Sequence, residues 1–289
     1  MTKKRVAIIG ASGFIGRSLH KQLAKKYTVT GTCYPREISG LYFLDITQAT
    51  EVNKFIHKTS PDIVIHLAAI TDLDLCERNK KLATDTHVLG TQNLVNTCQN
   101  KSIKFVYFST DNVFDGKKGN YNEKDIPNPI NVYGKTKLAG EQEVQKLKNA
   151  IILRTSMPFG IESNGKFING TIEKLKNKQL VTAFTDMIRS PTEMSDLTQA
   201  VHTLIESDFS GIIHCVGSSK LSMYDAALEI AEVFGCEKNL IHKSKSTDLQ
   251  LDAVRPYDTS LNNSLAKKNG LKFCTFKEGL IKLKKQMTN

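Results

Sequence analysis

The amino-acid sequence predicts an α/β fold in which helices cover both faces of a doubly wound parallel sheet. Short apolar, β-rich runs alternate with helical stretches through the first half of the chain, as in successive βαβ units. A glycine-rich turn follows the first of these runs directly and precedes the first helical stretch. The length of 289 residues suits one large α/β domain or a large domain with a smaller companion.

The first half of the chain supplies the elements of this sheet in order. Residues 5–9 are continuously apolar after the first position, which is typical of a buried parallel strand. The loop at residues 115–129 is polar and too long for a plain connection, so we expect it to be functional. We expect five further strands at residues 28–33, 41–44, 63–67, 105–108 and 151–153, and helices at residues 14–25, 48–58, 83–99 and 133–148.

The second half is less regular, and it contains no internal repeat and no low-complexity segment. We expect helices at residues 197–205 and 226–234 and one more strand at residues 212–216. The sequence is therefore divided into a sheet-bearing domain, residues 1–155, and a smaller α/β part, residues 156–289, with an interleaved boundary. The second part is expected to cover the strand ends, where it forms a wall of the substrate pocket.

The composition argues against several kinds of partner. The net charge of +11 would suit a polyanion, but the lysines are scattered and no basic tract with interleaved aromatic residues occurs. We therefore expect no nucleic-acid partner and a solvated basic surface, which steers a small phosphorylated substrate to its cleft. No apolar run reaches the about 18 residues of a membrane helix, so we expect a cytoplasmic protein without a membrane partner.

The six cysteines are widely spaced and do not predict a metal site or a disulfide framework. They form no C-x-x-C pair and do not lie beside histidines at metal-ligand spacing. We expect buried, reduced thiols.

The turn Gly10-Ala11-Ser12-Gly13-Phe14-Ile15-Gly16 has the spacing and position of a dinucleotide-binding fingerprint. Glycines there permit the tight turn, the approach of the backbone to a pyrophosphate, and close packing of helix on strand. The N–H groups at the start of the following helix can bind the phosphates. Because a strand precedes the turn and a helix follows it, we expect a Rossmann-type dinucleotide site rather than a purely structural turn.

The end of the second expected strand indicates which nicotinamide cofactor binds. NAD sites normally have an acidic residue there, but this chain reads Thr32-Cys33-Tyr34-Pro35-Arg36 and has no acid before Glu37. Arg36, with help from Arg17, could pair with a 2′-phosphate. The sequence therefore predicts NADPH, with NADH left open as an alternative.

A tyrosine and a lysine four residues apart indicate carbonyl chemistry. Tyr133 and Lys137 lie at the head of an expected helix, where i, i+4 spacing places them on one face. A nearby ammonium is expected to lower the pKa of the phenol, which can then give a proton to a carbonyl oxygen as hydride reaches the carbon. Thr110, with Ser109 as the fallback, follows the fifth strand and is expected to hydrogen-bond the carbonyl.

These motifs together resemble the extended short-chain dehydrogenase/reductase superfamily and, within it, the dTDP-4-dehydrorhamnose reductase family. The resemblance implies that a 4-keto-6-deoxy sugar nucleotide is reduced to an alcohol in deoxysugar biosynthesis, and a homodimer is one oligomeric state to expect. The matching segments span nearly the whole chain and are residues 10–16, 44–47, 66–77, 108–116, 131–141, 154–156, 190–192 and 255–261.

The resemblance also implies roles for individual residues. Thr110, Tyr133 and Lys137 match the family's catalytic positions, and the last two also contact the cofactor. With the glycine turn and Arg36 predicted from the residues themselves, the cofactor residues further include Gly10, Ser12, Gly13, Phe14, Ile15, Gly16, Arg36, Asp45, Ile46, Ala68, Ala69 and Thr71. The implied substrate residues are Thr71, Thr110, Asn112, Met157 and Arg255.

The chain departs from the family pattern at three positions. Asn112 replaces a usual tyrosine and Met157 a usual tryptophan, and both positions face the sugar in the family. We therefore expect a related keto-sugar nucleotide as the substrate. His87 stands where asparagine is usual, and we interpret it as an ordinary core histidine.

The sequence leaves two other functions open. One is a cofactor-binding regulatory subunit, because the methionine adenosyltransferase β subunit is similar across this fold. The other is an epimerase or dehydratase of the same superfamily, although a dehydratase would use an acid pair where Thr110-Asp111-Asn112 supplies one acid.

Overall fold

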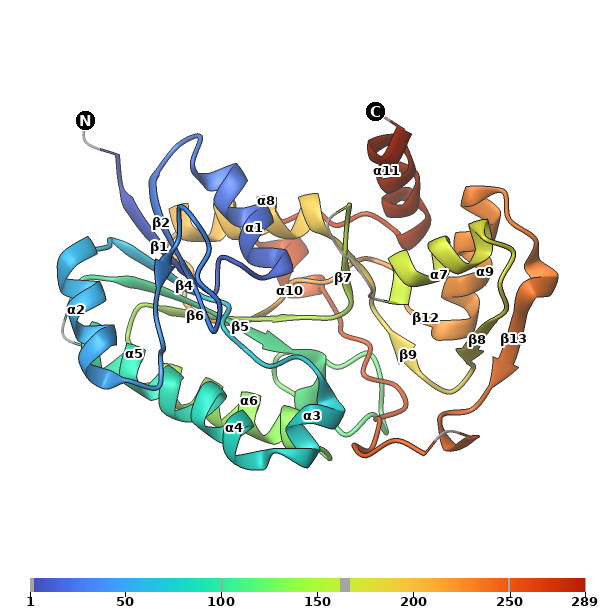
Figure 1. The fold of residues 1–289 in the computed structure, drawn as a ribbon, viewed down its shortest axis with the longest axis horizontal. Helices are drawn as coiled ribbons and strands as arrows, with labels where there is room; N and C mark the ends of the chain where they lie inside the picture. Colours follow the sequence, from blue (N-terminus) through green and yellow to red (C-terminus); the bar gives the residue numbers. More distant parts are fainter. Residues whose placement is uncertain (1–2, 100, 162–166, 249, 289) are drawn as a thin grey trace.

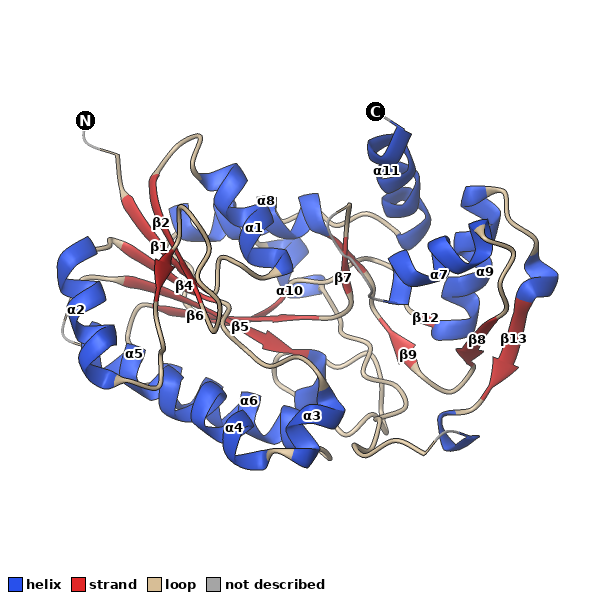
Figure 2. Ribbon diagram, viewed as in Figure 1, coloured by secondary structure: helices blue, strands red, loops and turns tan. Residues whose placement is uncertain are grey.

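The computed structural model describes residues 3–99, 101–161, 167–248 and 250–288. Its centre is a seven-stranded, entirely parallel sheet, which confirms the predicted doubly wound α/β fold (Figure 2). The strand order is β3-β2-β1-β4-β5-β6-β11, so the order reverses between β1 and β4. The strands are β1 (Arg5–Ile9), β2 (Thr28–Cys33), β3 (Tyr42–Phe43), β4 (Ile63–His66), β5 (Lys104–Thr110), β6 (Ala150–Thr155) and β11 (Gly211–His214).

Two hydrophobic cores cover the two faces of this sheet, and helices lie on both sides of it in Figure 1. Alternate residues of β1 divide between them, because successive side chains of a strand point to opposite faces. Val6 and Ile8 pack under α1 (Phe14–Leu23), α8 (Met194–Glu206) and α10 (Ser264–Lys268). Ala7 and Ile9 pack under α2 (Ala49–Thr59), α5 (Gly90–Cys98) and α6 (Val132–Val144). Three of the four helices expected in the first half are thus present with shifted ends, as α1, α2 and α6.

The single helix expected at residues 83–99 is wrong in its start and regularity. The structure has α3 (Leu73–Arg78), α4 (Lys80–Thr84), a π-helical turn (Asp85–Leu89) and then α5. The π turn carries the buried His87, whose ring nitrogens bond Ile70 N at 2.9 Å and Thr136 Oγ1 at 2.8 Å. A π turn adds a residue to the helical repeat and is seldom visible in an apolar pattern.

The C-terminal part has its own core and only short strands. Its helices α7 (Phe167–Lys176), α9 (Met223–Phe234) and α11 (Phe276–Thr288) pack around that core. The strands form three two-stranded pairs and were not predicted, because most have too few residues for a period to be recognised. They are β7 (Pro158–Phe159), β8 (Val181–Phe184), β9 (Ile188–Arg189), β10 (Thr192–Glu193), β12 (Leu221–Ser222) and β13 (Ile241–Ser244). The C-terminal part also has 3₁₀ turns at Lys238–Leu240 and Ser246–Asp248, and a further 3₁₀ turn, Asp111–Val113, directly follows β5.

The chain crosses more than once between the two parts. The strand expected at residues 212–216 is β11, which pairs with β6 at the edge of the main sheet. Helices α8 and α10 also return to that sheet, so a cut near residue 155 separates segments that pack together. No helix within the described part of the chain is long and apolar enough to cross a membrane.

Candidate active site

The carboxyl ends of the central strands bring most predicted site residues to one edge of the sheet. The glycine turn follows β1, and residues 67–72 follow β4, the neighbouring strand. Thr110 is the last residue of β5, and Met157 lies just beyond β6. Doubly wound sheets bind their ligands in the crevice outside these strand ends.

Two glycines of the turn are required by close backbone packing. Gly10 has a φ of +88°, and a Cβ there would lie 2.7 Å from the backbone nitrogen of Ala68. A Cβ on Gly16 would lie 2.4 Å from the carbonyl oxygen of Gly10. Any other residue would clash with backbone at both positions, so the turn holds β1, α1 and the loop after β4 together.

Gly13 differs from Gly10 and Gly16, because it is exposed and no protein atom would clash with a side chain at this position. Its φ is −73°, and a Cβ there would lie 3.4 Å from Gly10 O, at ordinary contact distance. It is the N-cap of α1, and within the described residues no side chain caps the helix from this position. The positive end of the helix dipole is therefore presented beside an exposed glycine, an arrangement that fits a pyrophosphate.

The residues that flank Gly13 complete this cradle. Ser12, Phe14 and Ile15 are half-buried around it. Arg17 Nη1 donates to the Ser12 carbonyl oxygen at 2.7 Å, which brings a guanidinium group beside the turn. The chemistry of the turn thus suits the diphosphate of a dinucleotide.

The residues expected at the adenosine end follow β2 and β3. Arg36 is exposed just beyond β2. Asp45 Oδ1 accepts hydrogen bonds from the amide and the hydroxyl of Thr47 at 2.9 and 2.8 Å. The Ile46 side chain is buried against Gly90, so only its backbone could line a ligand. The exposed guanidinium of Arg36 has the position and chemistry to meet a 2′-phosphate.

Thr110 and Tyr133 are both buried, at the end of β5 and in the first turn of α6. The Tyr133 side chain comes from the first turn of α6, whose N-cap Asn131 accepts a hydrogen bond from Gly134 N at 2.8 Å. Thr110 and Tyr133 are 6% and 8% exposed. Burial raises the pKa of Tyr133, and the Thr110 hydroxyl opposes that rise. The phenol therefore keeps its proton at neutral pH, as a proton donor must.

Lys137 lies one helical turn beyond Tyr133, but its ammonium is directed into the sheet. Nζ donates to the Phe108 carbonyl oxygen at 2.7 Å and lies 4.0 Å from the centroid of the Tyr107 ring. Burial lowers the pKa of Lys137 to about 7. The predicted lowering of the Tyr133 pKa by this ammonium is not seen, because Lys137 is engaged with Phe108 and burial dominates at Tyr133.

Ser109 has a structural role in place of the fallback catalytic role. Its hydroxyl donates to Glu141 Oε1, on the opposite side of β5 from Thr110. Glu141 also forms a fully buried pair with Arg154, whose Nε and Nη2 donate at 2.9 and 2.6 Å. The geometry therefore favours Thr110 as the hydroxyl that meets a ligand.

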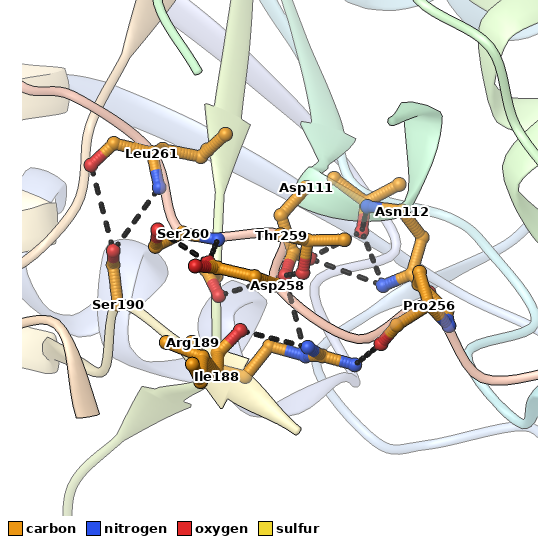
Figure 3. A network of polar contacts seen from close by, with 12 residues as sticks. Asp111, Asn112, Ile188, Arg189, Ser190, Pro256, Asp258, Thr259, Ser260 and Leu261 are labelled. Atoms are coloured by element: carbon orange, nitrogen blue, oxygen red, sulfur yellow. Dashed lines mark hydrogen bonds and ion pairs between the residues drawn. The ribbon is translucent and has the colours of Figure 1, made fainter. Parts of the chain in front are cut away.

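The sequence reasoning missed a polar network behind Thr110, which Figure 3 shows from close by. Its centre is Asp111, 4% exposed, whose Oδ2 accepts from Ser156 Oγ at 2.9 Å and Thr259 Oγ1 at 2.6 Å. Arg189 Nε lies 3.7 Å from the same oxygen, while both Nη groups of Arg189 bond backbone carbonyls. The sequence analysis noted Asp111 and the segment at residues 255–261 separately. It did not predict that Thr259 of this segment contacts Asp111.

Two residues expected to face a sugar have unusual surroundings. Asn112 Nδ2 donates to Asp111 Oδ1 at 3.1 Å and towards Thr110 Oγ1 at 3.4 Å. Asn112 Oδ1 is buried and has no hydrogen-bond partner within the described residues. Met157 has a φ of +42°, a left-handed conformation that costs free energy for a residue with a side chain. Such strain is typical of functional sites.

The remaining predicted residues lie on the loop after β4 and on the segment that covers it. Ala68 and Ala69 are half-buried and Thr71 is exposed. Arg255 is not free, because its Nη2 donates to Asp74 Oδ2 at 2.6 Å and its Nη1 to Ala253 O at 3.1 Å. A ligand phosphate would have to share this guanidinium with Asp74.

No group of three or more histidine, cysteine or acidic side chains placed to hold a metal ion occurs in the described part of the chain. His87 is neutral, since burial lowers its pKa to about 3, and it holds the loop after β4 through Ile70. This agrees with its interpretation as a core histidine.

Comparison with known proteins gives matches over nearly the full length of the chain. The family model described as RmlD substrate binding domain matches residues 4–289. A dTDP-4-dehydrorhamnose reductase of Aggregatibacter actinomycetemcomitans is 32% identical and covers 89% of this chain and 90% of that protein. Methionine adenosyltransferase 2 subunit beta of Xenopus laevis is 29% identical and covers 93% of this chain and 83% of that protein.

A solved structure matches equally well. The dTDP-4-dehydrorhamnose reductase of Bacillus anthracis, in complex with NADP, has a TM-score of 0.91 and is 30% identical. The match covers 99% of this chain and 100% of that chain. These findings confirm the resemblance inferred from the motifs.

Proposed function

We propose that this chain, which belongs to the RmlD substrate binding domain family, is an NAD(P)H-dependent reductase of a 4-keto-6-deoxy sugar nucleotide. The observation that carries the proposal is the buried Thr110–Tyr133 pair beside Lys137, at the strand ends next to the glycine turn. The dTDP-4-dehydrorhamnose reductases among its relatives support this substrate class. The product is the corresponding alcohol, in deoxysugar biosynthesis.

The chain's residues account for the proton side of the reaction. When bound, the nicotinamide supplies a hydride to the carbonyl carbon. Tyr133 donates its phenolic proton to the carbonyl oxygen, and burial suits it to this role because it holds that proton at neutral pH. The Thr110 hydroxyl hydrogen-bonds the same oxygen and orients it. Lys137, on the same helix face, would contact the nicotinamide ribose.

The remaining cofactor residues divide along the dinucleotide. Gly10, Ser12, Gly13, Phe14, Ile15 and Gly16 would hold the pyrophosphate, and Asp45 and Ile46 would border the adenine. Ala68, Ala69 and Thr71 would line the nicotinamide half. Arg36 favours NADPH over NADH, since its exposed guanidinium can form charge-assisted hydrogen bonds to a 2′-phosphate. A cytoplasmic location and a homodimer complete the proposal.

The sugar pocket differs from the family pattern, so the substrate is proposed to be a related keto-sugar nucleotide. Met157 offers a flexible thioether in place of an indole, and the Asn112 amide is turned towards Thr110 and Asp111. Rapid turnover of dTDP-4-dehydrorhamnose, with all other nucleotides rejected, would overturn this part of the proposal.

A second candidate function is a cofactor-binding regulatory subunit. The observation in its favour is the similarity to methionine adenosyltransferase 2 subunit beta. Binding of NADPH without turnover of any keto-sugar nucleotide, together with co-purification of a synthetase, would favour this function. The intact Thr110, Tyr133 and Lys137 favour catalysis.

Epimerisation and dehydration have less support. Dehydration would use Asp111 as an acid facing the substrate, but this carboxylate is buried and accepts hydrogen bonds from Ser156 and Thr259 behind the site. Epimerisation would leave no net consumption of NADPH, which separates it from reduction.

The decisive experiment is an NADPH-oxidation screen over a panel of 4-keto-6-deoxy sugar nucleotides. We expect one or more to be reduced with stoichiometric loss of NADPH. Tyr133→Phe should lower that rate by about 10²–10⁴-fold, the usual contribution of a general acid, while NADPH binding is kept. Full activity of this variant would exclude Tyr133 as the proton donor.

A further inference from the structure

Thr155, the last residue of β6, has a buried hydroxyl without a hydrogen-bond partner among the described residues. The residue is 7% exposed, and the unpartnered atom is Oγ1. Four hydroxyls around it, those of Ser109, Thr110, Ser156 and Thr192, all donate to protein acceptors. A buried hydroxyl that makes no hydrogen bond costs free energy, so the presence of threonine at this position requires an explanation.

The register of the sheet places Thr155 beside Thr110. Thr110 ends β5, Thr155 ends β6, and the two residues are partners in these neighbouring parallel strands. Neighbouring strands lie about 4.8 Å apart, and the side chains of paired residues stand on the same face of the sheet. Thr155 is therefore one strand spacing away from the threonine that we assign to the substrate carbonyl.

The two threonines lie on the face of the sheet that α1 covers. Phe108 and Leu153 precede them by two residues on their strands and belong to the core under α1. Residues two apart on a strand share a face. The chain beyond β6 also passes the glycine turn, because a Cβ built on Gly160 would lie 3.7 Å from Cζ of Phe14. Thr155 is thus on the same side of the sheet as the pyrophosphate cradle.

The topology of the sheet indicates which half of a dinucleotide reaches β6. In doubly wound sheets the two halves lie on either side of the point where the strand order reverses. Here the order reverses between β1 and β4, and Arg36, at the expected adenosine end, follows β2. The nicotinamide half therefore belongs over the ends of β4, β5 and β6, which are neighbours in the sheet (Figure 1).

We propose that the Thr155 hydroxyl binds the carboxamide group of the nicotinamide ring. The carboxamide has a carbonyl oxygen that accepts and an NH₂ group that donates, and a threonine hydroxyl can bond either of them. It is attached to the ring carbon next to the one that gives the hydride. A ring that faces a carbonyl held by Thr110 therefore carries its carboxamide to the neighbouring strand, where Thr155 holds the ring in one rotational orientation.

This inference rests on the proposed function only for the nicotinamide cofactor and not for the sugar substrate. Cofactor binding can be measured without a keto-sugar nucleotide, so the test applies to a reductase and to a regulatory subunit alike. A parent protein that binds neither NADPH nor NADH would overturn both proposals. A parent that binds one of them, with a Thr155 variant that binds it equally well, would overturn this one alone.

The test compares the binding of NADPH with that of 2′-phospho-ADP-ribose, which has the rest of the cofactor but no nicotinamide. Thr155→Val replaces the hydroxyl by a methyl group of similar shape. It is expected to raise the Kd for NADPH about 3- to 10-fold, the usual contribution of one neutral hydrogen bond, and to leave the Kd for 2′-phospho-ADP-ribose unchanged. Thr155→Ser keeps the hydroxyl and should restore the affinity for NADPH. Isothermal titration calorimetry measures each Kd.

Thermal unfolding of the ligand-free protein separates this role from a structural one. Because the Thr155 hydroxyl has no partner among the described residues, Thr155→Val should leave the unfolding midpoint unchanged or raise it. Thr97→Val is the control, since this half-buried hydroxyl donates to Asn93 O at 2.9 Å near the end of α5, close to where β5 begins. It should lower the midpoint and leave both Kd values unchanged.

Two results would overturn the proposal. One is an unchanged affinity for NADPH in a folded Thr155→Val variant, whatever its unfolding midpoint. The other is an equal loss of affinity for NADPH and for 2′-phospho-ADP-ribose, because the effect would then lie outside the nicotinamide. If the parent prefers NADH, the same comparison is made with NADH and ADP-ribose.

Discussion

Lys137 Nζ donates a hydrogen bond to the carbonyl oxygen of Phe108, 2.7 Å away, in the interior of the sheet. The lysine shares a helix face with Tyr133, yet its ammonium is held by β5 rather than by the phenol. Only 3% of Lys137 is exposed, and this burial lowers its pKa to about 7. The burial of this ammonium makes the stability of the fold depend on pH, in addition to its effect on the site.

The buried ammonium of Lys137 should make stability rise with pH. Between pH 7 and the ordinary lysine pKa of 10.5, the unfolded chain binds a proton that the folded chain has lost, so raising the pH favours folding. The contribution is about 1.4 kcal/mol per pH unit. Urea unfolding of the parent and of Lys137→Met should therefore diverge between about pH 7 and pH 9, with the parent gaining.

The matched control for this measurement is Lys135→Met, an exposed lysine of the same helix. It should follow the parent across the same range. The titration stops at pH 9 to limit ionisation of the cysteine thiols, because their ordinary pKa is 9.0 and burial raises it in the folded chain. Parallel pH dependences for the parent and Lys137→Met would contradict a lysine pKa near 7.

The glycines of the turn should separate folding from cofactor binding. Gly16→Ala places a Cβ 2.4 Å from Gly10 O and is expected to cost about 1–3 kcal/mol of stability, as overpacking does. Gly13→Ala meets no such contact and should leave the stability within about 0.5 kcal/mol, yet weaken NADPH binding at least about tenfold. Thermal unfolding and NADPH fluorescence titration measure the two effects, and unchanged affinity in Gly13→Ala would speak against a pyrophosphate at this turn.

Arg36→Ala should remove the preference for NADPH. Loss of a charge-assisted pair with the 2′-phosphate is expected to raise the Kd for NADPH about tenfold or more and leave the Kd for NADH unchanged. Arg5→Ala is a suitable control, because Arg5 begins β1 and so lies at the edge of the sheet opposite to the strand ends that carry the site. Its Nε lies 3.7 Å from Asp62 Oδ2. If the parent already binds both cofactors equally, Arg36 does not select NADPH.

The Glu141–Arg154 pair should be more important for stability than any surface ion pair. Both side chains are 1% exposed, so removing one partner leaves an unpaired charge in the core. Arg154→Met is expected to cost about 3–5 kcal/mol in urea unfolding. Combining it with Glu141→Leu should recover part of this loss, and a double variant as unstable as the sum of both single changes would argue against charge burial as the cause.

Local patterns carried most of the fold prediction. Short β-rich runs identified the six leading strands, and the glycine spacing located the turn between β1 and α1. The i, i+4 spacing put Tyr133 and Lys137 on one helix face, and Thr110 fell at the end of its strand as expected. These features depend on neighbours in the chain, so a single sequence contains them.

Contacts between distant segments were beyond these patterns. The two-residue strands of the C-terminal part exist only because each finds a partner, such as β9 with β12. The π turn at Asp85–Leu89 depends on what His87 bonds across the core. The same limit applies to Asp111, whose partners Ser156, Arg189 and Thr259 lie far along the chain.

The sequence by itself therefore determined the doubly wound sheet, the glycine turn and the presence of a hydroxyl, a phenol and an ammonium for carbonyl chemistry. Only the tertiary structure decided how these groups are connected. It turned Lys137 to Phe108, held Asp111 by Arg189 behind Thr110, and directed Ser109 to Glu141. The physical reason is that residue spacing fixes which face a side chain occupies, whereas its pKa and its hydrogen-bond partner are set by whatever the rest of the chain packs against that face.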